Sequence, residues 1–306
     1  MRVLVTGGAG FIGANLSRRL IDDGHEVVVL DDLSTGRTGN LEGADLDLVE
    51  GSVTDAHTVG RLVGGADRIV HLAARASVPR SIAEPLAAHE VNVTGTVHVL
   101  EAARARSVPV VVASSSSVYG DTAVSPKHED LPVAPRSPYA ASKLAAEGYT
   151  LAYGVAYALP VMALRFFNVY GPLQAADHPY AAVVPRFVDA ALAGRALEVH
   201  GDGSQSRDFT FVGDVVEVLA RAVAEAMTAP GPINLAFGTR TDLLDLVSRI
   251  ERVVGVPIAV EHTDSRPGDV AHSTAAGERL RAAFPDIIPV DLDDGLAATV
   301  AWFRSA

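Results

Sequence analysis

A glycine-rich segment directly after an apolar strand constrains the fold of this chain more than any other feature. Residues 2–6 (RVLVT) are typical of a short buried strand, and GGAGFIG follows at once and leads into a helical pattern over 11–21. Gly7, Gly10 and Gly13 stand three residues apart, the spacing at which a tight turn brings bare amides and a helix N-terminus up to a pyrophosphate. The segment therefore predicts a dinucleotide site at the end of the first strand.

A second strand, residues 26–30, ends in an acid. Asp31 stands 18 residues after Gly13. At that place a carboxylate accepts hydrogen bonds from the adenosine ribose hydroxyls and repels a 2'-phosphate, so NAD is favoured over NADP. Arg37 lies close enough in sequence to keep some use of NADP open.

The rest of the first half alternates between strand-like and helical patterns. Alternation of this kind predicts crossover units and an α/β fold, a Rossmann-type doubly wound parallel sheet. After Phe167, glycine and proline break the chain into short elements, as expected of a smaller α/β substrate-binding lobe. We therefore expect a cofactor domain over 1–166, to which 207–236 returns, and a substrate lobe over 167–306. The expected strands are 27–30, 46–49, 68–71, 108–114 and 160–166, and the expected helices lie near 14–22, 55–64, 83–106 and 138–154.

Composition excludes several functions. The 306 residues are 48% apolar, enough to bury a full core, and they include no cysteine, so disulfides and thiolate chemistry are excluded. A net charge of -12 argues against a nucleic-acid surface. The ten histidines lack ligand spacing, so no metal is predicted. The apolar runs are too short to span a bilayer, and a strand from residue 2 leaves no room for a signal peptide, so no membrane association and a cytoplasmic protein are expected.

Two lysines remain in the chain against 23 arginines, and one of them follows a tyrosine by four residues. Tyr139 and Lys143 lie in the stretch SPYAASK, and positions i and i+4 share one face of a helix. A neighbouring ammonium lowers the pKa of a phenol, which then acts as a general base near neutral pH. Taken alone, such a pair is more often part of a solvated helix face.

Five motifs in order carry a family resemblance that runs from Met1 to about Trp302. The chain resembles the extended short-chain dehydrogenase/reductase family, in its branch of NAD-dependent nucleotide-sugar epimerases and dehydratases. The motifs are GGAGFIG with Asp31; HLAA (71–74) and Asn92; SSSSVYG (114–120) before SPYAASK (137–143); RFFNVYGP (165–172); and GDGSQSRDFTFV (201–212) with RPGD (266–269).

The resemblance implies a role for each matching residue. Tyr139 stands where the family's base takes the sugar hydroxyl proton while hydride passes to NAD, and Lys143 stands where the family lowers the tyrosine pKa and holds the nicotinamide ribose. Ser115 matches the family's catalytic Ser/Thr. The NAD contacts implied are Gly7, Gly10, Phe11, Ile12, Gly13, Asp31, Asp32, Ser34, Ser52, Val53, Leu72, Ala73, Ala74, Asn92, Ser114, Tyr139, Lys143 and Phe166. The nucleotide-sugar contacts implied are Arg80, Ser115, Ser116, Ser117, Tyr139, Asn168, Val184, Arg207, Arg266, Asp269 and Ser273.

The two positions after Ser115 bear on the reaction. Family dehydratases place Asp-Glu there and decarboxylases place Glu, because elimination and carboxyl loss need an extra acid or base. This chain has Ser116 and Ser117. The resemblance therefore implies a 4-epimerase of a UDP-sugar, in which hydride returns to C4 from bound NADH. A dehydratase or net oxidoreductase and a non-catalytic NAD-sensing regulator stay open.

The sugar is left open between three series. Ser273 matches a position where, by family resemblance, a small residue admits an N-acetyl group, so UDP-N-acetylglucosamine is expected to fit as well as UDP-glucose. UDP-glucuronate is the rival, although Asn168 and Ala175 stand where glucuronate epimerases usually carry Thr and Arg. By the same resemblance a homodimer is expected, formed through alanine-rich helix faces (Ala102, Ala103, Ala140, Ala141, Ala145, Ala146).

Overall fold

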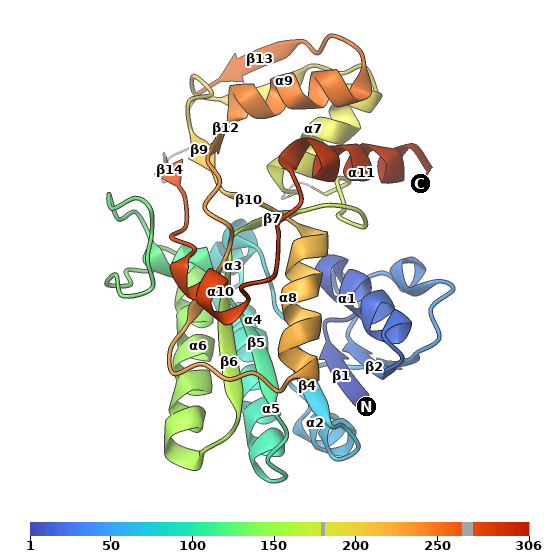
Figure 1. The fold of residues 1–306 in the computed structure, drawn as a ribbon, viewed down its shortest axis with the longest axis vertical. Coiled ribbons are helices and arrows are strands. Elements are labelled where there is room, and N and C mark those ends of the chain that lie inside the picture. The colour runs from blue at the N-terminus through green and yellow to red at the C-terminus, as the bar shows by residue number, and fades with distance from the viewer. Residues whose placement is uncertain (179–180, 265–271, 306) are drawn as a thin grey trace. The chain divides into compact units, whose positions relative to one another are not determined.

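The chain forms two compact units. The computed structural model describes residues 1–178, 181–264 and 272–305 (Figure 1). The first unit comprises residues 1–120, 133–166 and 216–233, and the second comprises 121–132, 167–215 and 234–306.

This division differs from the expected domain boundaries in two places. The short segment 121–132, which directly follows the serine-rich motif, belongs to the second unit, and the return to the first unit covers 216–233 rather than 207–236. Hydrophobic periodicity could not have predicted these boundaries. The local pattern of a segment indicates its secondary structure, not the unit against which it packs.

The first unit holds the predicted doubly wound sheet. Strands β1 to β6 pair in parallel, and the order along the sheet reverses between β1 and β4, which creates a crevice at their carboxyl ends. The strands are β1 (Arg2–Thr6), β2 (Glu26–Asp31), β3 (Asp47–Glu50), β4 (Arg68–His71), β5 (Val110–Ser115) and β6 (Val161–Phe166). With β11 (Ile233–Leu235) at the edge beside β6, their order in the sheet is β11-β6-β5-β4-β1-β2-β3.

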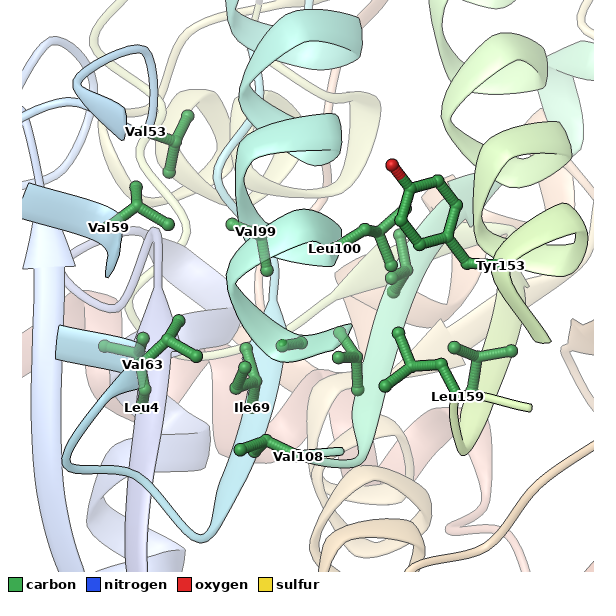
Figure 2. Packing of buried hydrophobic residues seen from close by; sticks show 14 of the residues in the cluster. Leu4, Val53, Val59, Val63, Ile69, Val99, Leu100, Val108, Tyr153 and Leu159 are labelled. Carbon is green, nitrogen blue, oxygen red and sulfur yellow. The ribbon is translucent and has the colours of Figure 1, made fainter. Parts of the chain in front are cut away.

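Helices cover both faces of this sheet. On one face α2 (Ala56–Val63), α5 (Gly95–Arg104) and α6 (Pro138–Tyr157) pack in a row, and Figure 2 shows the apolar side chains between them and the strands. Side chains on the other face, such as Val3 and Val29, are fully buried as well. A sheet buried on both faces explains why its strands read as continuous apolar runs rather than alternating ones.

The opposite face carries α1 (Phe11–Asp22), which packs on β1 and β2. Its Arg19 forms an ion pair with Glu217 of α8 (Val212–Ala224). This pair fixes the returning segment 216–233 to the first helix of the sheet.

The helix expected over 83–106 is interrupted. The structure has α3 (Val78–Ala83), α4 (Pro85–His89), a π-helical turn at Glu90–Thr94 and then α5. Proline favours the first turn of a helix and disfavours its interior, so Pro85 begins a new helix instead of continuing α3. The π turn contains Asn92, and such turns often mark functional sites.

The second unit has a core of its own. Helices α7 (Val183–Leu192), α9 (Leu243–Val254) and α11 (Leu292–Ser305) pack on one another around buried residues that include Phe187, Leu246 and Leu296. The strands form three small sheets: β7 (Asn168–Tyr170) with β10 (Phe209–Phe211); β8 (Leu197–His200) with β13 (Val260–Thr263); and β9 (Ser206–Arg207) between β12 (Thr241–Asp242) and β14 (His272–Ser273). Within the described ranges, the chain has no helix of the length and apolarity needed to cross a membrane.

Candidate functional site

The glycine turn after β1 is too crowded for side chains. Gly7 has φ +72°, and a Cβ there would lie 2.7 Å from the amide nitrogen of Ala73, beyond the end of β4. A Cβ on Gly13 would lie 2.3 Å from the Gly7 carbonyl oxygen. Phe11, Ile12 and Gly13 form the first turn of α1, whose N–H groups have no acceptor within the helix. The turn is therefore a cradle of backbone amides suited to a diphosphate.

Substituting Gly13 with alanine is expected to disturb both the fold and cofactor binding. The new methyl group would push the Gly7 carbonyl away, which should lower the free energy of unfolding by about 1–3 kcal/mol and weaken NAD binding about tenfold or more. Thermal unfolding and NAD calorimetry measure the two effects. Gly60→Ala is the matched control, because Gly60 lies inside α2 with open space around its Cβ position and should tolerate the methyl group. Equal effects at the two positions would contradict the cradle.

Asp31 lies at the carboxyl end of β2 and holds the glycine turn. One carboxylate oxygen accepts the amide of Ala9 at 2.9 Å, and the other accepts the amide of Leu33 at 2.9 Å. Burial raises the pKa of Asp31, and these amides oppose that rise. The predicted ribose contact thus starts from a carboxylate that is already fixed in place beside the turn.

The other predicted NAD residues lie along the same strand ends. The amides of Leu72 and Ala73 donate to the Thr6 carbonyl and hydroxyl oxygens at 3.0 and 3.3 Å. The Ser52 hydroxyl accepts the amide and hydroxyl of Thr54 at 3.2 and 2.9 Å. The remaining predicted residues on this edge are Asp32, which accepts the Ser34 amide and hydroxyl; Val53, buried near Gly95; Ala74, which follows Ala73; Asn92 in the π turn; Ser114 on β5; and Phe166, which pairs with Ser115 across β5 and β6.

The three predicted catalytic side chains come together in the first unit. Ser137 caps α6 and Pro138 begins it, which places Tyr139 in its first turn and Lys143 one turn later. The Lys143 ammonium is buried and donates to the carbonyl of Ala113 on β5 at 2.7 Å. The Tyr139 and Ser115 side chains form a hydrogen bond.

The electrostatics of this trio differ from the expectation in one respect. Burial raises the pKa of Tyr139, opposed by the hydrogen bond with Ser115, so the phenol does not lie below its usual range despite the nearby Lys143. Burial also lowers the pKa of Lys143 to about 8. The Lys143 ammonium is desolvated and donates a hydrogen bond to the Ala113 carbonyl. It therefore lowers the pKa of the phenol less than the i,i+4 spacing suggested.

Hydrogen bonds that the sequence motifs did not indicate anchor the start of α6. The Ser81 hydroxyl accepts the amide of Tyr139 at 3.0 Å. Asn92 donates through its amide nitrogen to the Ser142 hydroxyl at 2.8 Å and accepts the amide of Arg75 at 2.8 Å through its oxygen. Ser142 in turn donates to the carbonyl of Tyr139 at 2.8 Å. The π turn therefore ties the tyrosine to the segment after β4.

Ser116 and Ser117 form a short 3-10 turn after β5. The amide and hydroxyl of Ser117 lie 3.2 and 2.9 Å from the Ser115 oxygen, to which both donate. No carboxylate replaces these serines, so this turn offers hydroxyl groups and no proton-transfer group of suitable pKa. Arg80 is half-buried on α3, which packs against α6.

Several predicted substrate residues line one cavity in the second unit. The cavity has a volume of about 280 Å³, and its walls include Asn168, Val184 and Arg207. Asn168 donates to the carbonyl of Asp208 at 3.1 Å. Arg207 pairs with the buried Ser273 across β9 and β14. Phe187, His200 and Gln205 complete the walls without having been predicted, and Arg266 and Asp269 lie outside the described residues.

Over the described ranges, no three histidine, aspartate or glutamate side chains gather in an arrangement able to hold a metal ion.

Known proteins resemble this chain in sequence and in structure. A family model described as the NAD dependent epimerase/dehydratase family matches residues 3–236. A UDP-glucose 4-epimerase of Mycolicibacterium smegmatis is 43% identical over 100% of this chain and 99% of its own length. A UDP-N-acetylglucosamine 4-epimerase from Methanobrevibacter ruminantium, solved with UDP-N-acetylmuramic acid, is 37% identical with a TM-score of 0.94, covering 99% of this chain and 98% of its own. A UDP-glucose 4-epimerase of Thermus thermophilus in complex with NAD is 35% identical with a TM-score of 0.89, covering 100% of both chains.

Proposed function

This chain belongs to the NAD-dependent epimerase/dehydratase family, and we propose that within it the chain is a 4-epimerase of a UDP-sugar. Relatives at 33% and 34% identity include a decarboxylase and a dehydratase, so membership alone does not choose the reaction. The observation that carries the proposal is the pair Ser116 and Ser117 beside Ser115, where no acid is present to take a 4-keto sugar further.

NAD is the cofactor of this family, and the residues of the first unit fit it. The turn at Gly7 and Gly13 leaves only backbone where a Cβ would collide, and Asp31 lies at the end of the neighbouring strand. When bound, NAD would supply the hydride acceptor and, in its reduced form, the hydride donor. The amides of the cradle hold the diphosphate, and the carboxylate of Asp31 receives the adenosine ribose hydroxyls.

Three side chains of the first unit carry the proton transfer. Tyr139 takes the proton of the sugar C4 hydroxyl as the C4 hydride leaves, and it gives the proton back when the hydride returns to the opposite face. Ser115 hydrogen-bonds the oxygen that becomes a carbonyl. Lys143 supplies a positive charge beside the phenolate that forms, from a buried position fixed by the Ala113 carbonyl.

The cavity of the second unit is proposed to receive the UDP part of the substrate. Arg207 and Asn168 on its wall suit a diphosphate, since a guanidinium binds phosphate oxygens in a bidentate manner and an amide donates to them. Ser273, which pairs with Arg207, is small, and by the family resemblance a small residue at this position admits an N-acetyl group. We therefore propose the UDP-glucose and UDP-N-acetylglucosamine series as substrates. UDP-glucuronate is the second candidate, supported by the hydroxyl groups of Ser116 and Ser117.

Product analysis tests this proposal. Purified protein with trace NAD is incubated separately with UDP-glucose, UDP-N-acetylglucosamine and UDP-glucuronate, and the anomeric proton signals are followed by NMR. Conversion of one substrate into its 4-epimer supports the proposal and names the sugar. A 4-keto-6-deoxy product, a pentose product, or NADH formed in step with product would contradict it.

The protein is also proposed to form a homodimer. Large apolar side chains are exposed on α4 and α6, among them Leu86 (77%), Val155 (87%) and Tyr157 (52%). Of the alanines expected to form the interface, Ala103, Ala140 and Ala146 are buried within the subunit and so are not available for it. A mass measurement in solution should give twice the mass of the 31.9 kDa chain, and a monomeric mass would refute the dimer.

A further inference from the structure

Helix α6 rests on three consecutive residues of β5 through three of its own side chains. Lys143 donates to the Ala113 carbonyl, Glu147 accepts the Ser114 hydroxyl at 2.6 Å, and Tyr139 bonds to the Ser115 side chain. Tyr139, Lys143 and Glu147 are each one helical turn apart. The proposed catalytic residues thus share their docking surface with Glu147, to which the proposed reaction assigns no role.

Glu147 is held by a buried ion pair. The Arg165 guanidinium, at the end of β6, donates to the two Glu147 carboxylate oxygens at 2.9 and 2.6 Å. Glu147 and Arg165 are each 3% exposed, and Arg165 stacks 4.7 Å over the ring of Tyr119, just beyond Ser115. The pair therefore joins α6, β5, β6 and the serine turn, the elements that carry the proposed catalytic residues.

Burying two charges costs solvation free energy, and the attraction within the ion pair often does not recover it. Apolar residues of similar volume at the same positions frequently give a protein of equal or greater stability. A buried pair is best explained where it fixes one arrangement among several. We propose that Glu147 and Arg165 are positioning residues, which set the register of α6 on β5 and so place Lys143 and Tyr139 against Ser115. This inference rests on the proposed function for the roles of those three residues.

The net charge of the Glu147–Arg165 pair affects the pKa of the neighbouring Lys143. Lys143 lies one turn from Glu147, and burial lowers its pKa to about 8. The ionisable groups facing this region from other elements are Tyr119 after β5, Arg165 on β6 and His71 on β4. His71 stays neutral, because burial and then the charge of Lys143 lower its pKa to about 3. Breaking the pair should therefore shift the pKa of Lys143, downward if the guanidinium remains and upward if the carboxylate remains.

The test uses the fact that the chain has only two lysines, Lys127 and Lys143. Lysine labelled with carbon-13 at the side chain gives two NMR signals, whose titration midpoints are read without any assay of activity. Glu147→Gln leaves a lone guanidinium and should lower the Lys143 midpoint, whereas Arg165→Met leaves a lone carboxylate and should raise it, each by about half a pH unit or more. Lys127, in the second unit, should titrate as before.

Kinetics separate positioning from a purely structural role. Glu147→Gln should lower kcat about 10- to 100-fold with KM changed less than about threefold. The double variant Glu147→Leu with Arg165→Met should recover stability but not kcat. The matched control is Glu26→Gln, which breaks the exposed pair with Arg2 in the first unit and should change neither readout.

Two outcomes would overturn the inference: Lys143 midpoints that do not move in opposite directions, or activity that returns together with stability in the double variant. If the unaltered protein shows no epimerisation, the proposed function fails, but the Lys143 titrations still decide whether the pair controls the site. The two failures are therefore distinguishable.

Discussion

Tyr139→Phe is expected to lower kcat for epimerisation by about 10²- to 10⁴-fold, the range over which a positioned general base contributes. The Tyr139 phenol bonds to Ser115 and stands one turn from Lys143. Phenylalanine keeps the ring and removes the hydroxyl. Since the cradle of Gly7 and Gly13 is untouched, NAD should bind with an affinity within about threefold of the original. NMR product assays and NAD calorimetry measure the two quantities.

The matched control is Tyr149→Phe. Tyr149 lies on the same helix but is 46% exposed, so loss of its hydroxyl should leave kcat unchanged. A Tyr139→Phe enzyme that retains more than about a tenth of the original kcat would show that another group takes the proton.

Lys143→Met is expected to have the second largest effect. The substitution removes a buried positive charge and leaves the Ala113 carbonyl without its 2.7 Å partner, so kcat should fall about 10²- to 10³-fold. The pH profile should change as well. In the unaltered protein the ammonium, with a pKa of about 8, loses its charge as pH rises, which predicts a fall in activity on the alkaline side. Methionine has no such charge to lose, so that alkaline fall should disappear.

Lys143→Arg provides the control for charge. It keeps a permanent cation, yet its planar fork does not reproduce the geometry of a single ammonium donor at Ala113, so it should recover only part of the activity. Full recovery with arginine would show that charge alone matters and that the buried geometry does not. An alkaline fall that persists in Lys143→Met would assign it to another group.

The local patterns of the sequence predicted the sheet and the shared helix face of Tyr139 and Lys143, whereas Ser115 was indicated by the family resemblance. Hydrophobic periodicity and glycine spacing indicated β1, the turn after it and α1. The structure confirms a doubly wound sheet, with Asp31 at the end of β2. The i,i+4 spacing of Tyr139 and Lys143 predicted that both side chains point to one face, and both do reach β5. These features depend on residues within one or two turns of each other.

Long-range partners were not predictable in the same way. Ser114 and Glu147 are 33 residues apart, and Ser81 and Tyr139 are 58 apart, so no periodicity connects them. The π turn at Asn92 was missed because one inserted residue leaves no recognisable mark on a helical sequence pattern. The raised pKa of Tyr139 depends on how deeply α6 is buried, which a helical pattern does not specify.

In the proposed reaction, one hydride leaves C4 of the sugar and returns to the same carbon. This is tested with the UDP-sugar that the protein converts, carrying deuterium at C4, with NAD at about a hundredth of the substrate concentration. We expect a 4-epimer that keeps its deuterium at C4, with many turnovers for each NAD and no accumulation of NADH. Loss of the deuterium to solvent, or a product amount limited to the NAD added, would contradict it.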